Sequence, residues 1–281
     1  ACSLGNNHSM DYGYQSLVDT QNALDQAGIV YGYNQHIGTY TTKEGLKIGI
    51  VSASLLSQSL EVENYLKEGI AQEEKGAHIL DVNVGLPEID EVAMLKTAVC
   101  ELQAIINLPL QIDTASATAM EAALRRYNGK AMINSVNGKE SSMREIFPLV
   151  KKYGGVVVAL TLDENGIPTT WEGRVEIAKK ILATAAEYGI EKKDIIFDTL
   201  AMTISADSSA AKATLKALEY IRYELGCHTS LGVSNVSFGL PNRDAVNSTF
   251  FACAMERGLS AAIMNPFSAG MMKTYHAYNA L

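Results

Sequence analysis

The sequence is poor in cysteine and lacks a basic tract, and each shortage excludes a class of protein. Its four cysteines are scattered, and no pair has C-x-x-C or zinc-finger spacing. We therefore expect free thiols in a reducing compartment. The formal net charge is −8 and no run is rich in Lys or Arg, so nucleic acid is not an expected partner. The cysteines are Cys2, Cys100, Cys227 and Cys253.

Long apolar segments are missing as well. No apolar stretch reaches the roughly 20 residues that a membrane-spanning helix needs. Residues 1–15 have neither the basic start nor the apolar segment of a signal peptide. We therefore expect no membrane partner and a cytoplasmic location. With 281 residues, 47% of them hydrophobic, the chain can bury the core of one large α/β barrel or of two smaller domains.

From residue 46 onward, short apolar runs alternate with longer amphipathic ones. The apolar runs lack strict alternation, which is typical of strands buried on both faces. About 235 residues with eight strand–helix units predict an α/β fold of the (β/α)8 TIM barrel type. A doubly wound open sheet is the alternative, weakened by the absence of a Gly-rich phosphate loop after any strand. The predicted strands are 46–53, 78–85, 108–114, 130–136, 155–163, 194–200, 230–237 and 260–266.

The first 45 residues differ from the rest. They contain one helical pattern at 14–28, followed by a Gly-, Tyr- and Thr-rich connection that predicts a loose linker near 32–45. We therefore divide the chain into an N-terminal appendage, 1–45, and a barrel, 46–281.

Polar residues follow the apolar part of six predicted strands. In a barrel of this type, chemistry belongs at the carboxyl ends of the strands, so these side chains should share one mouth. Thr114, Ser116 and Asn265 are expected to act only as caps or in turns. For the others, several buried polar groups without partners would be costly unless a ligand satisfies them. They are Asp81, Asn83, Asp113, Asn134, Asp198 and Asn235.

The character of this set narrows the chemistry. It has no His, Cys or Lys, so metal-assisted hydrolysis, thiol catalysis and Schiff-base chemistry lack their parts. A mouth of carboxylates and carboxamides suits a flat heterocycle rich in N–H donors. A pterin fits, because its 2-amino and N3–H groups can both donate to one carboxylate.

Several stretches also carry a family resemblance: "GAHILDVNVG", "IDT", "AMINS", "IIFD", "GVSNVSFGLPNR" and "AAIMNP". Residues from about 66 to 281 resemble the methyltetrahydrofolate-dependent corrinoid methyltransferases, which include the folate domain of cobalamin-dependent methionine synthase. The resemblance implies a barrel that binds methyltetrahydrofolate and passes its N5-methyl group to a Co(I) corrinoid.

The resemblance also implies roles for individual residues. Asp113, Asn134 and Asp198 match positions that hydrogen-bond the pterin ring, and Asp81 and Asn83 match the motif that lines the same mouth. Asn235 matches the family's Asn near N5, where a carboxamide can donate a hydrogen bond as the N–methyl bond breaks. Arg243 matches an arginine near the rim of the site.

Partners and alternatives follow from what the chain does not contain. It has no D-x-H-x-x-G corrinoid motif and no clustered-Cys zinc site, so the folate half-reaction is expected, with cobalamin supplied by a partner protein or domain. We expect the chain to be a segment of a larger polypeptide, and a homodimer stays open. One alternative is a dihydropteroate synthase, but that family has S-R-K on strand 7 where this chain has Ser234-Asn235-Val236.

A second alternative is a pterin-binding domain without turnover. The family's first strand carries a Glu, an Arg and an Asn, and residues 46–53 have none of them. Residues 1–53 instead resemble the capsule and poly-γ-glutamate synthesis metallophosphatases. Only Asn7 and His8 of that family's metal-ligand motif are present, so we expect no metal centre.

Overall fold

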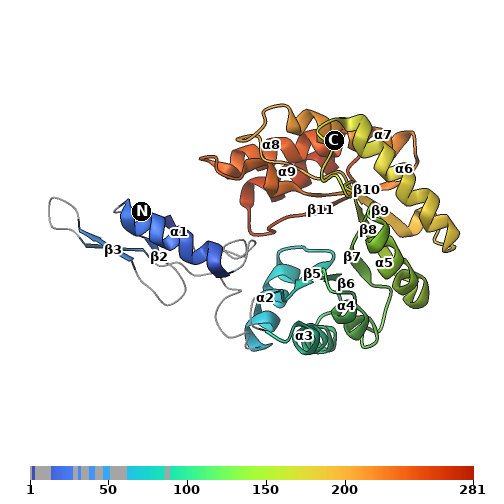
Figure 1. Cartoon of the computed structure of the whole chain (residues 1–281), viewed down its shortest axis with the longest axis horizontal. Helices are drawn as coiled ribbons and strands as arrows, with labels where there is room; N and C mark the ends of the chain where they lie inside the picture. Colours follow the sequence, from blue (N-terminus) through green and yellow to red (C-terminus); the bar gives the residue numbers. More distant parts are fainter. Residues whose placement is uncertain are drawn as a thin grey trace.

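The computed structural model describes residues 2–3, 14–27, 31–32, 38–41, 47–50, 62–85 and 89–281. Its largest part is a parallel seven-stranded sheet with helices around it (Figure 1). Each strand of this sheet pairs with the next one along the chain. The strands are β5 (Leu80–Asn83), β6 (Leu110–Asp113), β7 (Met132–Asn137), β8 (Val156–Leu160), β9 (Ile195–Asp198), β10 (His228–Gly232) and β11 (Ala261–Ile263).

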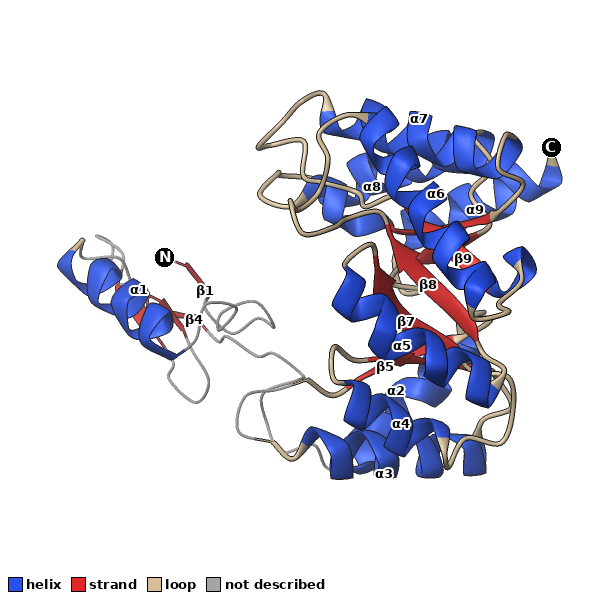
Figure 2. Cartoon of the chain, turned by 45° about the vertical axis from the view of Figure 1, so that its right-hand side comes forward, coloured by secondary structure: helices blue, strands red, loops and turns tan. Residues whose placement is uncertain are grey.

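A helix follows each of these strands, as the amphipathic patterns predict, and one more helix precedes β5. Figure 2 shows the helices packed around the strands of the large sheet. Two short 3-10 helices, η1 (Lys192–Asp194) and η2 (Val233–Ser237), flank β9 and β10. The α-helices are α2 (Val62–Glu74), α3 (Glu91–Ile105), α4 (Ala117–Leu124), α5 (Glu140–Tyr153), α6 (Trp171–Glu187), α7 (Ala210–Tyr223), α8 (Arg243–Glu256) and α9 (Ala269–Ala280).

This topology confirms the predicted fold class. A doubly wound sheet reverses its strand order at a switch point, whereas the order here runs without reversal from β5 to β11. The fold is therefore a nearly closed parallel barrel of the TIM type. Seven of the eight predicted strands lie in it, and the boundaries differ from the predicted runs by a few residues at each end.

The prediction for the first strand is wrong in its pairing. Lys47–Ile50 does form a strand, β4, within the predicted run 46–53. However, β4 pairs antiparallel with β3 (Gly38–Thr41) and not with β5 or β11. Lys47, Ile48, Gly49 and Ile50 have no partner in the seven-stranded sheet. An apolar run of strand length predicts a strand, but it does not select the neighbour with which the strand pairs.

The other N-terminal elements are short. Helix α1 (Tyr14–Gln26) confirms the helix predicted at 14–28. Strands β1 (Cys2–Ser3) and β2 (Tyr31–Gly32) form a parallel pair. Strand β3 runs through the stretch predicted as a loose linker, so that prediction is wrong for Gly38–Thr41. Figure 1 shows α1 and β3 apart from the large sheet. The division at residue 45 stays a prediction.

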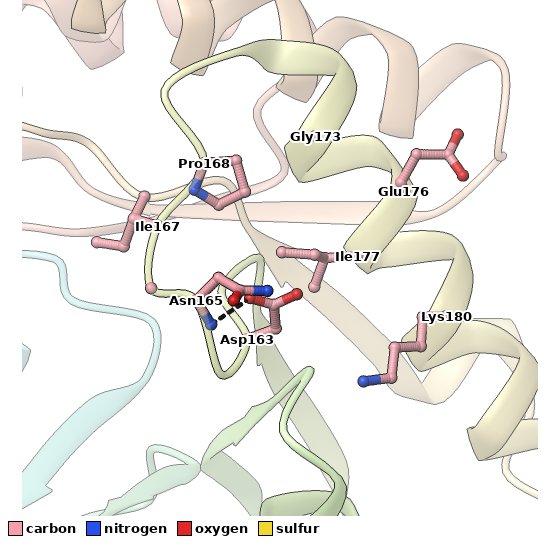
Figure 3. Close-up of a pocket in the computed structure, with 9 residues that line it drawn as sticks. Asp163, Asn165, Ile167, Pro168, Gly173, Glu176, Ile177 and Lys180 are labelled. Carbon is pink, nitrogen blue, oxygen red and sulfur yellow. Dashed lines mark hydrogen bonds between the residues drawn. The ribbon is translucent and has the colours of Figure 1, made fainter.

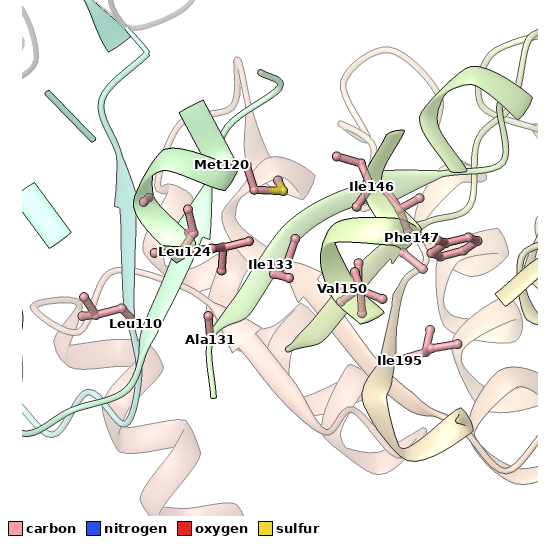
Figure 4. Close-up of a cluster of buried hydrophobic side chains, with 14 of the residues drawn as sticks. Leu110, Met120, Leu124, Ala131, Ile133, Ile146, Phe147, Val150 and Ile195 are labelled. Carbon is pink, nitrogen blue, oxygen red and sulfur yellow. The ribbon is translucent and has the colours of Figure 1, made fainter. Parts of the chain in front are cut away.

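The main core lies between the strands and the helices that cover them. Leu110 of β6 and Ile133 of β7 are fully buried and belong to the same cluster as Phe147 and Val150 of α5 (Figure 4). A second cluster joins β10, η2, α8 and α9. Within the described part of the chain, no helix has the length and apolar character needed to cross a membrane.

Packing also fixes the direction of the polar side chains. In β5, Leu80 and Val82 are buried in the main core, whereas Asp81 and Asn83 are exposed. Successive strand residues point to opposite faces of the sheet. Because Leu80 and Val82 point to the helices, Asp81 and Asn83 point to the barrel interior. Because all seven strands are parallel, their carboxyl ends open on the same side.

Candidate functional site

Two cross-strand pairs form the first part of the site. Asp81 lies opposite Gln111, and Asn83 lies opposite Asp113, in the register of β5 and β6. The Gln111 amide donates to Asp81 Oδ1 at 2.6 Å, and the Asn83 amide donates to Asp113 Oδ2 at 2.9 Å. Each carboxylate thus has one oxygen held by an amide. This fixes its orientation and leaves further acceptor capacity.

Asn83 is itself held in place by its neighbours. Its Oδ1 accepts the Gly85 N–H at 3.0 Å, and its backbone carbonyl accepts the Tyr65 hydroxyl from α2. Burial, and then the negative charge of Asp81, raise the pKa of Tyr65 to about 12. The Tyr65 phenol therefore stays a neutral donor at physiological pH.

The carboxyls of this pair of strands hold their protons more tightly than usual. Loss of hydration raises the pKa of Asp81 to about 7, the Asp113 charge adds to the rise, and the Gln111 hydrogen bond opposes it. Asp81 keeps contact with solvent at the open edge of β5, yet the surrounding protein removes much of its hydration. Loss of hydration also raises the pKa of Asp113; the Asn83 hydrogen bond lowers it and the Glu91 charge raises it.

Asn134 continues the row of polar groups onto β7. It lies opposite Asp113 in the register, and its carbonyl accepts the Thr114 N–H at 3.0 Å. The register with β8 shifts between Asn134 and Val136, which turns the chain where the polar segment begins. Register therefore places Asn83, Asp113 and Asn134 side by side on three consecutive strands.

Asp198 ends β9 and is buried, 7% exposed. Its Oδ1 accepts the Leu200 N–H at 2.7 Å. Burial raises the pKa of Asp198 to about 6, while backbone hydrogen bonds from Leu200 and Gly232 and the charge of Arg174 lower it. In the register, Asp198 lies opposite Leu160 of β8 and Ser230 of β10, neither of which ionises.

Asn235 lies beyond the end of its strand. Strand β10 ends at Gly232, and Asn235 sits in the middle of η2, exposed. A Cβ added at Gly232 would meet Asn235 Nδ2 at 3.0 Å, so the side chain folds back over the end of β10. Within the part of the chain that the structure describes, no protein group hydrogen-bonds this carboxamide.

Arg243, at the start of α8, contacts the same turn. Its Nε donates to Ser237 Oγ at 2.9 Å, its Nη2 donates to the Ser234 carbonyl at 3.0 Å, and its guanidinium lies 4.6 Å from the centre of the Phe238 ring. Arg243 thereby holds both sides of the turn that carries Asn235. Direct contact of Arg243 with a substrate stays a prediction.

The residues expected to cap helices or stabilise turns do so. Ser116 is the N-cap of α4 and accepts the Ala119 N–H, while Thr114 Oγ1 accepts the Ser116 N–H at 3.0 Å. Asn265 Oδ1 accepts the Phe267 N–H at 2.9 Å.

Two residues of the site, Gln111 and Tyr65, were not predicted from the sequence. Gln111 had a signal, since it is the one polar side chain inside the apolar run 108–112. Tyr65 had none, because it belongs to an ordinary amphipathic stripe.

A hollow of about 410 Å³ lies elsewhere, between the loop that follows β8 and the start of α6 (Figure 3). None of the predicted site residues lines it. Asp163 and Asn165 come from the loop, and Glu176 and Lys180 come from the helix. Lys180 donates to the Gly138 carbonyl at 2.6 Å.

Among the described residues, no group of three or more His, Cys, Asp and Glu could hold a metal ion. Asn7 and His8 lie outside the described residues.

Comparison with solved structures agrees with the fold. A dihydropteroate synthase from Xanthomonas albilineans, in complex with 7,8-dihydropteroate, superposes with a TM-score of 0.65 and 21% identity. The match covers 80% of this chain and 87% of that one. At this level of identity the likeness concerns the barrel alone.

Sequence comparison identifies closer relatives. A methylcorrinoid:tetrahydrofolate methyltransferase from Eubacterium limosum is 33% identical over 218 residues, covering 75% of this chain and 79% of the relative. The methionine synthases of Mycobacterium tuberculosis and Mycobacterium leprae are 34% and 33% identical, over 69% and 82% of this chain. The aligned regions make up 17% and 20% of those synthases, so the chain spans about a fifth of their length.

The family match covers all seven strands of the barrel and every predicted site residue, and it ends before α9. Residues 52–265 match the family described as pterin binding enzyme, and this range runs from the segment before α2 to two residues beyond β11. The chain belongs to the pterin binding enzyme family.

Proposed function

We propose that this chain binds methyltetrahydrofolate and transfers its N5-methyl group to a Co(I) corrinoid carried by a partner protein or domain. The observation that carries the proposal is the row of oriented acceptors on neighbouring strand ends. Asp81 and Asp113 are each held by an amide, and Asp198 is held by a backbone N–H. The N–H donors of a pterin ring match such a row.

Asp113, Asn134 and Asp198 hold the ring in this proposal, and Asp81 and Asn83 complete the wall. A charge-assisted hydrogen bond from a ring N–H to a buried carboxylate is stronger than one between neutral groups. It also favours the ionised form of the acid. Ligand binding should therefore lower the raised pKa values of Asp81 and Asp198.

Asn235 is the group that acts on the reaction. The N5–methyl bond breaks with its electron pair left on N5, so electron density grows at this nitrogen in the transition state. N5 must also gain a proton to give tetrahydrofolate, and the carboxamide is not its source; Asn235 donates a hydrogen bond to N5 without changing its own charge. A donor fixed in advance stabilises the transition state more than the ground state. The hydrogen bonds from Arg243 hold the turn that carries Asn235.

The corrinoid, when a partner presents it, supplies the Co(I) nucleophile that accepts the methyl group. The mouth described above contains no His or Cys side chain for holding a cofactor metal, so its residues fit the folate and not the corrinoid. The Eubacterium limosum relative is named for transfer from methylcorrinoid to tetrahydrofolate. Because a catalyst accelerates both directions of a reaction, the same residues serve either sense of transfer.

Two measurements on the full chain test the proposal. Isothermal titration with methyltetrahydrofolate measures binding, and stopped-flow absorbance measures methylation of a Co(I) corrinoid protein. Saturable binding and folate-dependent methylation are expected. Binding without methylation would identify a pterin-binding domain without turnover. Synthesis of dihydropteroate from a pterin diphosphate and aminobenzoate, without methyl transfer, would replace the proposal with a dihydropteroate synthase.

A further inference from the structure

Arg174 of α6 is a cation inside the protein, only 1% exposed. A buried charge is tolerated when it is fully hydrogen-bonded. Its Nε donates to the Pro168 carbonyl at 3.0 Å, and its Nη1 lies within 2.7–3.0 Å of the Thr199 and Leu200 carbonyls and of Thr214 Oγ1. One side chain therefore joins the loop before α6, the end of β9 and helix α7.

The contact with Thr199 reaches Asp198 through a single peptide group. The Thr199 carbonyl and the Leu200 N–H belong to the same peptide bond, and in a trans peptide they point in opposite directions. Arg174 holds the oxygen side, and the N–H side donates to Asp198 Oδ1 at 2.7 Å. Hydrogen bonds in such a chain polarise one another, so the cation strengthens the bond to the carboxylate.

Leu200 needs this support because its φ is +60°, in the left-handed region that non-glycine residues rarely adopt. Arg174 binds the carbonyls on both sides of this residue, and Thr214 Oγ1 donates to the Leu200 carbonyl at 3.0 Å. These contacts hold Leu200 in a conformation in which its N–H faces Asp198.

We propose that Arg174 is a positioning residue that fixes, through the Thr199–Leu200 peptide, the direction in which Asp198 presents its carboxylate to the substrate. This inference rests on the proposed function, in which Asp198 accepts a ring N–H. In this proposal, the Asp198 carboxylate is oriented by a residue of α6 that lies outside the mouth and does not touch the ligand.

Electrostatics agree with the geometry. The charge of Arg174 lowers the pKa of Asp198 against the larger effect of burial. Burial in turn lowers the pKa of Arg174, and Asp198 and Asp207 oppose that change. The neighbours of Asp198 in β8 and β10 are Leu160 and Ser230, so Arg174 is the ionised group that acts on it most directly. Asp81 and Asp113 are the other carboxyls of the mouth with a raised pKa, so they also contribute to the pH dependence of binding. Both are present in every variant below, so a difference between variants does not come from their removal.

The test measures the dissociation constant for methyltetrahydrofolate by calorimetry from pH 5.5 to pH 8, in the full chain. Arg174→Met should weaken binding by about tenfold or more, the effect of a disturbed charge-assisted hydrogen bond. It should also move the pH at which binding is half-maximal upward, because Asp198 loses the charge that favours its ionised form. Arg174→Lys keeps the charge and should recover part of both losses. Arg144→Lys on the surface of α5 is the matched control and should behave as the parent.

A second pair of variants decides the question if Arg174→Met does not fold. Thr214→Val keeps the size of the side chain and removes the hydroxyl that bonds both Arg174 and the Leu200 carbonyl. It should weaken binding and raise the pH midpoint, by less than Arg174→Met. Thr184→Val is its control, because Thr184 makes the same bond to a helix carbonyl four residues back, away from Asp198.

The outcomes separate this inference from the proposed function. A parent that binds folate, together with a folded Arg174→Met that has the parent's affinity and pH midpoint, overturns the inference alone. The same parental values in Thr214→Val overturn it if Arg174→Met is unfolded. A lower melting temperature with unchanged binding marks Arg174 as merely structural. A parent that binds no folate overturns the proposed function, and the inference falls with it.

Discussion

Single residues at the strand ends carry most of the proposed chemistry, and they divide into acceptors and one donor. Asp113 and Asp198 lie on β6 and β9, each with one oxygen already bonded within the protein. Asn235 lies on η2 with its carboxamide unpaired among the described residues. The first group should therefore govern affinity, and the second should govern rate.

Removing an acceptor should weaken binding. Asp113→Ala and Asp198→Ala each delete a charge-assisted hydrogen bond to the ring, worth about 1.5–3 kcal/mol, or roughly 10- to 150-fold in dissociation constant. Calorimetric titration with methyltetrahydrofolate measures this. Asp194→Ala is the control, because Asp194 precedes β9 at the opposite end of the same strand and pairs with Lys130. Parental affinity in both site variants would show that the pocket lies elsewhere.

Removing the donor should lower the rate constant of methyl transfer in the bound complex by a larger factor than it lowers the affinity for methyltetrahydrofolate. Asn235→Ala loses a preorganised hydrogen bond to N5, which costs roughly 3–4 kcal/mol in the transition state. The measurement is single-turnover stopped flow with a Co(I) corrinoid protein and saturating methyltetrahydrofolate. Asn128→Ala, before β7 at the far end of the barrel, should keep the parental rate. If the Asn235 variant stays within about twofold of the parent, a barrier change below roughly half a kcal/mol, Asn235 has no part in the mechanism.

Two raised carboxyl pKa values should couple binding to pH. Burial raises the pKa of Asp81 to about 7 and the pKa of Asp198 to about 6, above the ordinary value of about 4. Their contribution to stability is full below pH 4 and is lost as the pH rises through 6 and 7, because the folded state favours the protonated form. Ring N–H donors favour the opposite form, so affinity should increase from pH 5.5 to pH 7.5.

Proton release can be measured directly. Titrations at pH 6.5 in buffers of different ionisation enthalpy should give a binding enthalpy that varies with the buffer, in the sense of protons leaving the protein. An enthalpy independent of the buffer, together with a flat affinity profile, would show that neither carboxyl changes its protonation when the ligand binds.

Among the elements, η2 is the one whose exact place should matter most. It connects β10 to the loop before α8, and Arg243 ties it to the first turn of that helix. Gly232 lies at its base, where an added Cβ would meet Asn235 Nδ2 at 3.0 Å. The φ of Gly232 is −75°, which any residue can adopt, so alanine would act there through contact and not through backbone strain.

Gly232→Ala should therefore displace the carboxamide by a few tenths of an ångström. We expect a rate loss of roughly tenfold with little change in melting temperature, since catalysis depends steeply on placement. The double variant Gly232→Ala/Asn235→Ala provides the control. If the alanine side chain at position 232 acts by displacing Asn235, the rate losses of the two single variants should not add in the double variant. Additive losses would place the effect of Gly232 elsewhere.

At the scale of the whole molecule, the pattern of the sequence predicted the barrel because local periodicity encodes each strand–helix unit. It also predicted the polar row, because residues such as Asp113 and Asp198 interrupt apolar runs at their carboxyl ends. It could not predict that Lys47–Ile50 pairs with β3, since strand pairing depends on distant residues. Nor could it predict Arg174, which looks like an ordinary helix residue until α6 packs on the end of β9.

The division of the chain can be tested by truncation. The buried core residues run from Leu80 to Met271, and residues 18–27, the N-terminal stretch whose burial is described, include none. Removal of residues 1–45 should therefore leave the barrel folded, with a melting temperature within a few degrees of the parent. Thermal unfolding followed by circular dichroism measures this. A large fall in melting temperature, or loss of folate binding in a folded variant, would show that the N-terminal segment belongs to the barrel.

The strand order has a consequence for the way the molecule forms. Every pairing in the large sheet joins strands that are neighbours along the chain, from β5 to β11. Contacts of this kind close short loops and can form early, whereas contacts between distant segments are slow to form. The sheet can therefore grow one strand–helix unit at a time as the chain leaves the ribosome. Only a contact between its first and last strands would have to wait until β11 has been synthesised.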